Sequence, residues 1–450
     1  MSRRVAGLAF AVLLAACDPN VGPPEPPAPP PVDVQLRQQL DRWGVIPIGP
    51  VPRQDPALVA LGRALFFDKL LSGNRDVSCA TCHHPASHLG DGLSLAVGTG
   101  GTGSGTARTP GEGREFVPRN APSLLNAGLG LFYLFWDGRI SGFPGGSFDT
   151  PAGSLLPPGL PNVLAAQAMF PVLDRREMRG QPGDTDVFGG PNELAQLGDS
   201  QLTAIWQGVM RRVLAFPEYR SLFAAAFPGT PEIQLGFEHA ARAIAAFEIE
   251  AFTRTQSPFD RYLERDAAAL TAEQKRGALL FFGEARCGSC HNGPLLGGGF
   301  ANVGAPQIGP GTETAAPLDR GRGDVIGVEQ YAFFFRVAPL RNVELTAPYM
   351  HSGAYPTLEA VVRHYNDVPK ALRQYDVTQL QPALRDRYHG DDATVSAVLQ
   401  TLDFRVRTPL QLTDGQQREL VAFLQSLTDP AARDLAGLAP PRVPSGLPVN

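Results

Sequence analysis

Two short motifs carry the clearest chemistry of the chain. Residues 79–83 read Cys-Ala-Thr-Cys-His, and residues 287–291 read Cys-Gly-Ser-Cys-His. Both have the C-x-x-C-H pattern through which c-type haem is attached. In this pattern the two thiols add to the haem vinyl groups, and the adjacent histidine reaches the iron as proximal ligand. The sequence therefore predicts two covalently bound haems with His83 and His291 as iron ligands, attached through Cys79, Cys82, Cys287 and Cys290.

Two other chemistries also use paired cysteines. A structural zinc site would need the two pairs to meet in space. A redox dithiol of the thioredoxin type would need a strand–helix–strand context, which the sequence pattern does not show. Five cysteines in 450 residues are too few for a disulfide scaffold.

Helices are expected around each haem motif. Asp55-Pro56 is a helix-start signal before the first motif, and the capping box Thr271–Gln274 opens a helix that runs to Phe282, just before the second. Further helices are expected over Ala240–Phe252 and after Thr413. No segment shows sustained period-two alternation, so we expect an all-α fold of two cytochrome c-type domains, each with one haem.

The composition indicates a globular protein and argues against a nucleic-acid-binding function. Hydrophobic residues make up 43% of the chain and charged residues 18%, which is enough to bury a core. The formal net charge is −5, and no Lys/Arg stripe is present, so we expect no nucleic-acid partner.

The N-terminus has the pattern of an export signal. Arg3 and Arg4 precede an apolar run that ends in Leu-Ala-Ala before Cys17. This predicts a lipoprotein signal over residues 1–17, with Cys17 lipidated, although an ordinary signal peptide with an incidental cysteine is the alternative. A Pro-rich linker follows over residues 18–32. We therefore expect a periplasmic protein held to a bacterial membrane by a lipid anchor.

Several blocks between and after the motifs resemble the bacterial di-haem cytochrome c peroxidase family, which includes the MauG-type enzymes. These blocks are residues 119–126, 135–139 and 340–353, together with Gln167, Pro171 and Glu177-Met178. The resemblance implies that hydrogen peroxide reacts at the His83 haem and that the His291 haem relays electrons. It assigns Trp136 to the electron path between the haems, Glu177 to proton transfer, and Gln167 and Pro171 to the distal face.

The same resemblance implies a calcium ion between the domains. Asn120, Thr346 and Pro348 match the positions that hold it, and oxygen donors suit so hard an ion. His351 matches a family histidine near the path between the haems, without a defined role.

Two positions depart from the peroxidase pattern and resemble the MauG branch instead. Tyr365, fourteen residues after His351, stands where peroxidases have a methionine ligand, so we expect it to ligate the second haem iron. A core tyrosine on a helix face is the alternative. Thr99, sixteen residues after His83, stands where many peroxidases have a distal histidine, so we expect an open first haem that needs no reductive activation. His88 stays a minor alternative ligand.

One further departure limits the MauG analogy. Ala285 stands where the MauG enzyme has a tryptophan on the route to its partner protein. The function expected is oxidation of a partner protein with peroxide. The alternative is reduction of peroxide with electrons from a small cytochrome or copper protein, and a non-catalytic electron carrier is a third reading. The expected domains are residues 33–265 and 266–430, followed by a tail over residues 431–450.

Overall fold

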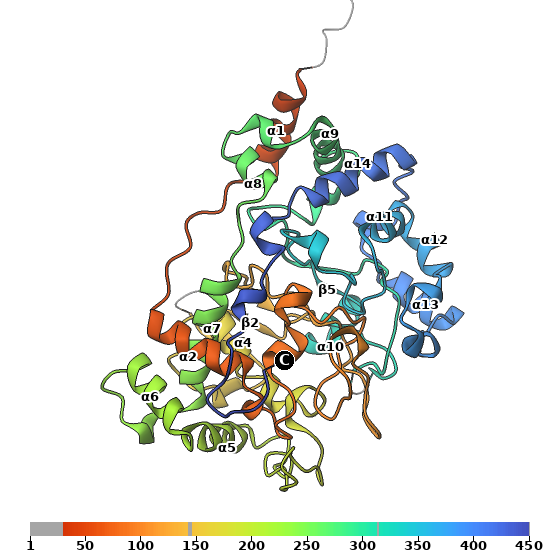
Figure 1. Cartoon of the computed structure of the whole chain (residues 1–450). Coiled ribbons are helices and arrows are strands. Elements are labelled where there is room, and N and C mark those ends of the chain that lie inside the picture. The colour runs from red at the N-terminus through yellow and green to blue at the C-terminus, as the bar shows by residue number, and fades with distance from the viewer. Residues whose placement is uncertain (1–29, 143–145, 313–314, 450) are drawn as a thin grey trace, which may run out of the picture.

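The computed structural model describes residues 30–142, 146–312 and 315–449. The expected signal peptide, Cys17 and most of the Pro-rich linker lie outside these residues. Within them the chain forms two helical halves joined through a long, irregular middle section (Figure 1). The helices are α1 (Val32–Arg42), α2 (Pro56–Phe67), α3 (Cys79–Cys82), α4 (Val163–Ala168), α5 (Leu202–Leu214), α6 (Pro217–Ala226), α7 (Phe237–Phe252), α8 (Pro258–Leu263), α9 (Ala272–Phe282), α10 (Arg322–Ile326), α11 (Leu358–Asn366), α12 (Val368–Arg373), α13 (Asp392–Gln400) and α14 (Asp414–Gln425).

The helix starts follow the capping signals of the sequence. The Asp55 carboxylate accepts a hydrogen bond from the Ala57 amide at the start of α2. Thr271 and Gln274 form a reciprocal capping box at the start of α9, and Thr413 with Gln416 does the same for α14. These predictions are confirmed.

Each half is built on one close crossing of two helices, made possible by a glycine. In the N-terminal half, α2 crosses α7, and a Cβ on Gly62 would clash with the Ala243 carbonyl. In the C-terminal half, α9 crosses α14, and a Cβ on Gly277 would clash with the Glu419 carbonyl. In both cases the helix that carries the glycine precedes a C-x-x-C-H motif, so the two crossings fix the two motifs in the same way.

The fold is not purely helical, which corrects the all-α expectation. Strands β1 (Tyr133–Leu134), β2 (Ile140–Gly142) and β3 (Phe148–Asp149) form an antiparallel sheet. Strands β4 (Phe300–Ala301) and β5 (Phe335–Arg336) form an antiparallel pair in which Phe300 lies opposite Arg336. Ladders of two or three residues are too short to leave an alternating pattern in the sequence, which is why they were not expected.

Each end of the described chain packs against the half of the molecule that is more distant from it in sequence. Helix α1 packs on α9 in the C-terminal half, where the Trp43 indole donates to the Phe282 carbonyl over 2.8 Å and Lys275 pairs with Asp33 over 2.8 Å. In Figure 1 the last segment returns to the N-terminal half, beside α4 and α7. There Leu435 is buried in the core of that half. Helix α1 therefore packs with the C-terminal half, and the tail packs with the N-terminal half. The expected domain boundaries stay a prediction.

Polar contacts hold the tail in place. The Ser445 hydroxyl donates to the Asp68 carboxylate over 2.6 Å, and the Arg63 guanidinium donates to the Leu438 carbonyl over 2.9 Å. None of the helices in the described ranges combines the length and the apolar character that crossing a bilayer requires.

Candidate functional site

One large cavity of about 1500 Å³ lies between the two halves. Both C-x-x-C-H motifs line it, which brings together residues that are about two hundred positions apart in the sequence. The motif residues on its wall are Cys79, Cys82, His83, Cys287, Cys290 and His291. The cavity therefore has the lining that two covalently attached haems need.

Both motif histidines are oriented in the same way. His83 Nδ1 lies 3.1 Å from the Leu89 carbonyl oxygen, and His291 Nδ1 lies 2.9 Å from the Leu296 carbonyl oxygen. Burial lowers the pKa of both imidazoles to about 4, so both rings are neutral at physiological pH. A neutral ring that donates from Nδ1 presents an unprotonated Nε2, which is the form that binds a metal.

The cysteine thiols suit attachment and not thiolate chemistry. Burial raises the pKa of Cys79 and of Cys287 to about 12, so both stay protonated. No three His, Cys, Asp or Glu side chains in the described part of the chain are grouped to hold a metal ion. The zinc alternative, which needs the two cysteine pairs to meet, therefore finds no support.

Glu177 lies in a π-helical turn, Arg175–Arg179, at the wall of the cavity. The Asp174 carboxylate accepts hydrogen bonds from the Arg176 and Glu177 amides, which fixes the start of the turn. Burial raises the pKa of Glu177 to about 8, with a further contribution from Asp174, while Arg139 opposes the shift. A carboxyl with a pKa near the working pH is able both to take and to give a proton.

The Gly-rich loop is packed against this turn. A Cβ on Gly98 would clash with the Arg176 carbonyl, so only glycine allows the approach. The Thr99 amide donates to the Glu177 carbonyl over 2.9 Å, and the Thr99 hydroxyl donates to Asp76 over 2.7 Å. The Thr99 hydroxyl is thus engaged with Asp76, and Thr99 is not among the described residues that line the cavity. Gln167 on α4 and Pro171 line the same cavity as Glu177.

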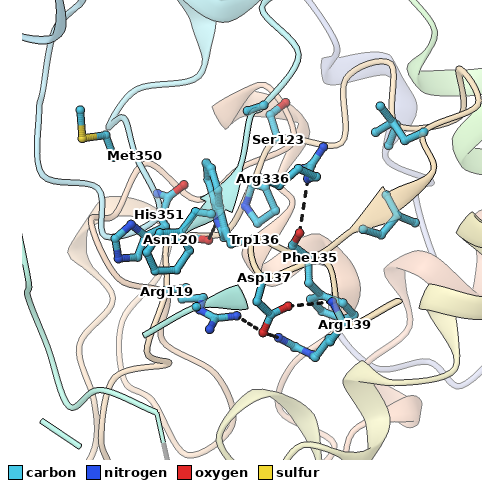
Figure 2. Close-up of a pocket in the computed structure, with 18 of the residues that line it drawn as sticks. Arg119, Asn120, Ser123, Phe135, Trp136, Asp137, Arg139, Arg336, Met350 and His351 are labelled. Atoms are coloured by element: carbon cyan, nitrogen blue, oxygen red, sulfur yellow. Dashed lines mark hydrogen bonds and ion pairs between the residues drawn. The ribbon is translucent and has the colours of Figure 1, made fainter. Parts of the chain in front are cut away.

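Trp136 lies between the two halves. Its indole donates to the Asn120 carbonyl over 2.9 Å, and its own carbonyl accepts from the Arg336 amide of β5 over 2.7 Å. Figure 2 shows Trp136 beside Asn120 and His351. Contacts from both halves therefore hold this tryptophan in the wall of the cavity.

A buried ionic cluster ties the halves together next to Trp136. Arg119 pairs with Asp137 over 2.5 Å, and Arg139 pairs with the same Asp137 over 3.0 Å (Figure 2). Arg119 also pairs with Asp319 of the second half over 2.6 Å. The charge of Arg119 holds the pKa of Asp137 well below its usual value, although burial opposes this. The cluster thus stays ionised.

Tyr365 lies on α11 and faces the half of the cavity that holds the second motif. Leu358, Val361 and Val362 of the same helix also line the cavity, as the helical spacing predicts. Burial raises the pKa of the Tyr365 phenol, and the Cys290 and Cys287 thiols contribute in the same direction. Its place as a ligand to the second haem stays a prediction.

The residues matched to a calcium site also line the cavity. Asn120 Nδ2 donates to the Leu93 carbonyl over 2.8 Å, and the Thr346 hydroxyl donates to the Val343 carbonyl over 3.1 Å. Pro348 follows in the same wall. This donor set consists of neutral oxygens, which are of the kind that calcium binds.

His351 is buried beside this wall. Its ring stacks on Phe335 with centroids 3.5 Å apart, and its carbonyl accepts from the Asn120 amide over 2.8 Å. Burial lowers the pKa of His351 to about 4, so the ring is neutral, and Asp319 only partly opposes the shift. His88, by contrast, is not among the residues that line the cavity within the described ranges.

Three cavity residues were not singled out from the sequence. Arg139 stacks over the Phe135 ring at 3.6 Å and lies near Glu177. Glu248 on α7 lines the cavity, and its Oε2 is buried without a hydrogen-bond partner among the described residues. Arg336 lines it as well, and its Nη1 is likewise buried without a partner in the described structure. Of these three residues, only Glu248 was detectable from the sequence, because it is an acidic residue on an otherwise apolar helix face.

Comparisons with known proteins agree on one family. The family model for di-haem cytochrome c peroxidase matches residues 56–268. The methylamine utilization protein MauG of Methylorubrum extorquens is 30% identical over 85% of this chain and 82% of its own length. The cytochrome c551 peroxidase of Pseudomonas aeruginosa is 35% identical over 65% of this chain and 67% of its own length.

Solved structures share the fold. A MauG-like protein associated with microbial copper homeostasis aligns with a TM-score of 0.61 and 26% identity, over 89% of this chain and 99% of its own. The di-haem peroxidase BthA of Burkholderia thailandensis aligns with a TM-score of 0.55 and 24% identity, over 89% of this chain and 95% of its own.

Proposed function

Because the chain belongs to the di-haem cytochrome c peroxidase family and acts on hydrogen peroxide, we propose that it uses peroxide to oxidise a partner protein. The observation that carries this proposal is the joint placement of Tyr365 and Thr99. Tyr365 faces the half of the cavity with the second motif, and the Thr99 side chain is engaged with Asp76. A phenolate donor favours the oxidised state of a haem iron, unlike the thioether of methionine.

The haem bound at His83 would supply the iron at which peroxide binds and its O–O bond breaks. Glu177 takes the proton from one peroxide oxygen and delivers it to the other. Gln167 donates a hydrogen bond to the bound peroxide, and Pro171 limits the space on that face. Trp136 carries electrons from the second half towards the first. In total, hydrogen peroxide takes up two electrons and two protons and is reduced to two molecules of water.

In the first reading the two electrons come from tryptophan or tyrosine side chains of a partner protein. The second reading is a peroxidase, in which a small cytochrome or copper protein supplies them. Ala285 favours this second reading, because it is buried and has no aromatic ring to carry electrons to the surface. Both readings place the partner outside the cytoplasm, since we propose a periplasmic protein lipidated at Cys17.

Turnover with defined partners separates the two readings. The holoenzyme is mixed with peroxide and either a reduced small c-type cytochrome or an exported protein encoded beside this chain. Oxidation of side chains in the exported protein, detected as a mass change, supports the first reading. Sustained oxidation of the cytochrome at many turnovers, with the exported protein unchanged, would replace it with the second.

We also propose that Asn120, Thr346 and Pro348 hold one calcium ion. The support is that all three line the cavity wall between the halves, and that the Asn120 amide nitrogen is engaged with Leu93, which leaves its oxygen available. Elemental analysis of the holoenzyme should find about one calcium ion per chain. A value near zero after purification without chelators would contradict the proposal.

A further inference from the structure

Arg336 is a partly buried cation with no acidic partner in the described structure. Its Nε donates a long hydrogen bond to the Phe135 carbonyl over 3.3 Å, and its Nη1 is buried without any hydrogen-bond partner (Figure 2). Burial alone lowers the pKa of Arg336 to about 10, because no carboxylate lies close enough to oppose the shift. A guanidinium stays charged in proteins, so this charge must be balanced by an anion.

Several arginines with largely buried side chains do have such partners. Each of them pairs with at least one carboxylate: Arg119 with Asp137 and Asp319, Arg179 with Asp199, Arg212 with Glu193, and Arg341 with Asp260. Arg254 also has a buried, unpartnered Nε and no carboxylate partner among the described residues, but of these two arginines only Arg336 lines the cavity. An anion bound in this cavity would balance the charge of Arg336.

The position of Arg336 limits what that anion is. The residue lies on β5 in the second half, and its amide donates to the Trp136 carbonyl of the first half over 2.7 Å. Its side chain lines the cavity that both haem motifs share. A c-type haem carries two propionate carboxylates as its ionised groups. A guanidinium matches a carboxylate with two parallel hydrogen bonds.

We propose that Arg336 binds a haem propionate at the junction of the two haem sites. The backbone of the same residue holds Trp136 while its side chain holds the propionate, so Arg336 fixes one haem edge relative to the tryptophan. The propionate belongs to either the His83 haem or the His291 haem, and measurement of the two haem potentials distinguishes them. Arg336 is a positioning residue, because it acts on the electron path through the haem and Trp136.

The inference has a consequence for reduction potential. Reduction removes one positive charge from the haem, so a nearby guanidinium favours the reduced form. Replacing Arg336 by glutamine removes this charge and leaves the propionate uncompensated. We expect the ratio of reduced to oxidised form of one haem to fall about tenfold at fixed potential, which corresponds to a midpoint lower by about 59 mV for one electron.

The test is a spectroelectrochemical titration of the holoenzyme in the wild type and in Arg336→Gln, with haem content measured on the same samples. The matched control is Arg322→Gln, because Arg322 lies at the same interface but bonds the Gly138 carbonyl over 2.8 Å and stacks on Phe300. We expect one midpoint to fall in Arg336→Gln only. Two unchanged midpoints with both haems bound would overturn the inference and leave the proposed function intact.

A second variant covers the case in which Arg336→Gln does not fold. Arg336→Lys keeps the charge and loses the planar pair of donors. We expect its haem midpoints to stay near those of the wild type, while the propionate-bending band of one haem shifts in resonance Raman spectra. An unchanged band would overturn the inference. A wild type without two haems would instead overturn the proposed function.

Discussion

The amide of Thr99 donates a 2.9 Å hydrogen bond to the carbonyl oxygen of Glu177. The loop that could have carried a distal ligand thus supports the turn that carries the candidate proton-transfer group. Gly98 makes the contact possible, since any side chain there would clash with the same turn. The open first haem site that we propose and the fixed position of Glu177 would both follow from this one packing arrangement.

Replacing Glu177 by glutamine should slow the reaction with peroxide by about 10²- to 10⁴-fold, because the amide does not take up the peroxide proton. Stopped-flow absorbance of the oxidised holoenzyme after peroxide addition measures this rate. The control is Glu115→Gln, since Glu115 is exposed and only pairs with Arg176 over 3.5 Å. Equal rates in Glu177→Gln and wild type would remove Glu177 from the mechanism.

The pH dependence of the same rate reports the ionisation of Glu177. Burial raises its pKa to about 8, and only the ionised carboxylate accepts a proton from peroxide. The wild-type rate should therefore rise with pH and level off above about pH 8. In Glu177→Gln this rise should be absent, and a variant that keeps the wild-type profile would assign the titration to another group.

Replacing Tyr365 by phenylalanine or methionine should change the spectrum of the second haem and leave that of the first unchanged. Phenylalanine removes the phenol oxygen, and methionine substitutes a softer donor that raises the reduction potential. Electron paramagnetic resonance and a redox titration measure both effects. Tyr355→Phe is the control, because Tyr355 bonds His364 over 2.8 Å and lies outside the cavity lining. Identical low-spin signals in wild type and Tyr365→Phe would show that Tyr365 is not a haem ligand and is a core residue instead.

Replacing Glu248 by glutamine should stabilise the protein at neutral and higher pH. Burial raises the pKa of Glu248 to about 8 in the folded chain, well above the 4.5 of an exposed glutamate. The raised pKa of Glu248 therefore contributes its full stabilisation to the folded state below pH 4.5. This contribution is lost as the pH rises from 4.5 through about 8. Calorimetric melting temperatures of wild type and variant should agree near pH 4 and diverge steadily up to pH 8. Parallel curves over this range would show that Glu248 is not buried as an isolated acid.

The packing of the C-terminal tail on the N-terminal half predicts an effect on stability far from the haem sites. Leu435 of the tail is buried in the core of the N-terminal half, so Leu435→Ala should lower the free energy of unfolding by about 2–5 kcal/mol. The control is Ile233→Ala, because Ile233 is 93% exposed and its loss should change stability by less than about 0.5 kcal/mol. Urea unfolding measures both, and equal midpoints would contradict the packing of the tail.

The parts of the fold that local signals encode were predictable. The helices at Pro56, Ala272 and Asp414 begin where the sequence has capping residues. The haem motifs were identifiable because their chemistry needs fixed residue types at fixed spacing. Neither inference depends on contacts between distant segments.

Long-range contacts were not predictable in the same way. The packing of α1 on α9, and of the tail on the N-terminal half, joins residues far apart in sequence, with no motif to mark them. Arg336 gave no signal either, because a buried unpaired charge is defined only by what surrounds it. Glu248 was detectable in principle, since it interrupts the apolar face of the helix that contains Ile244.

The most direct test of the central claim is the response of the fully oxidised holoenzyme to peroxide. The protein, with both haems bound and no reductant present, is mixed with a stoichiometric amount of peroxide in a stopped-flow spectrometer. We predict an immediate change in the haem absorbance, because our proposal gives the first haem no distal ligand at the position of Thr99. No change until one haem has first been reduced would contradict the account and point to a site closed by a ligand.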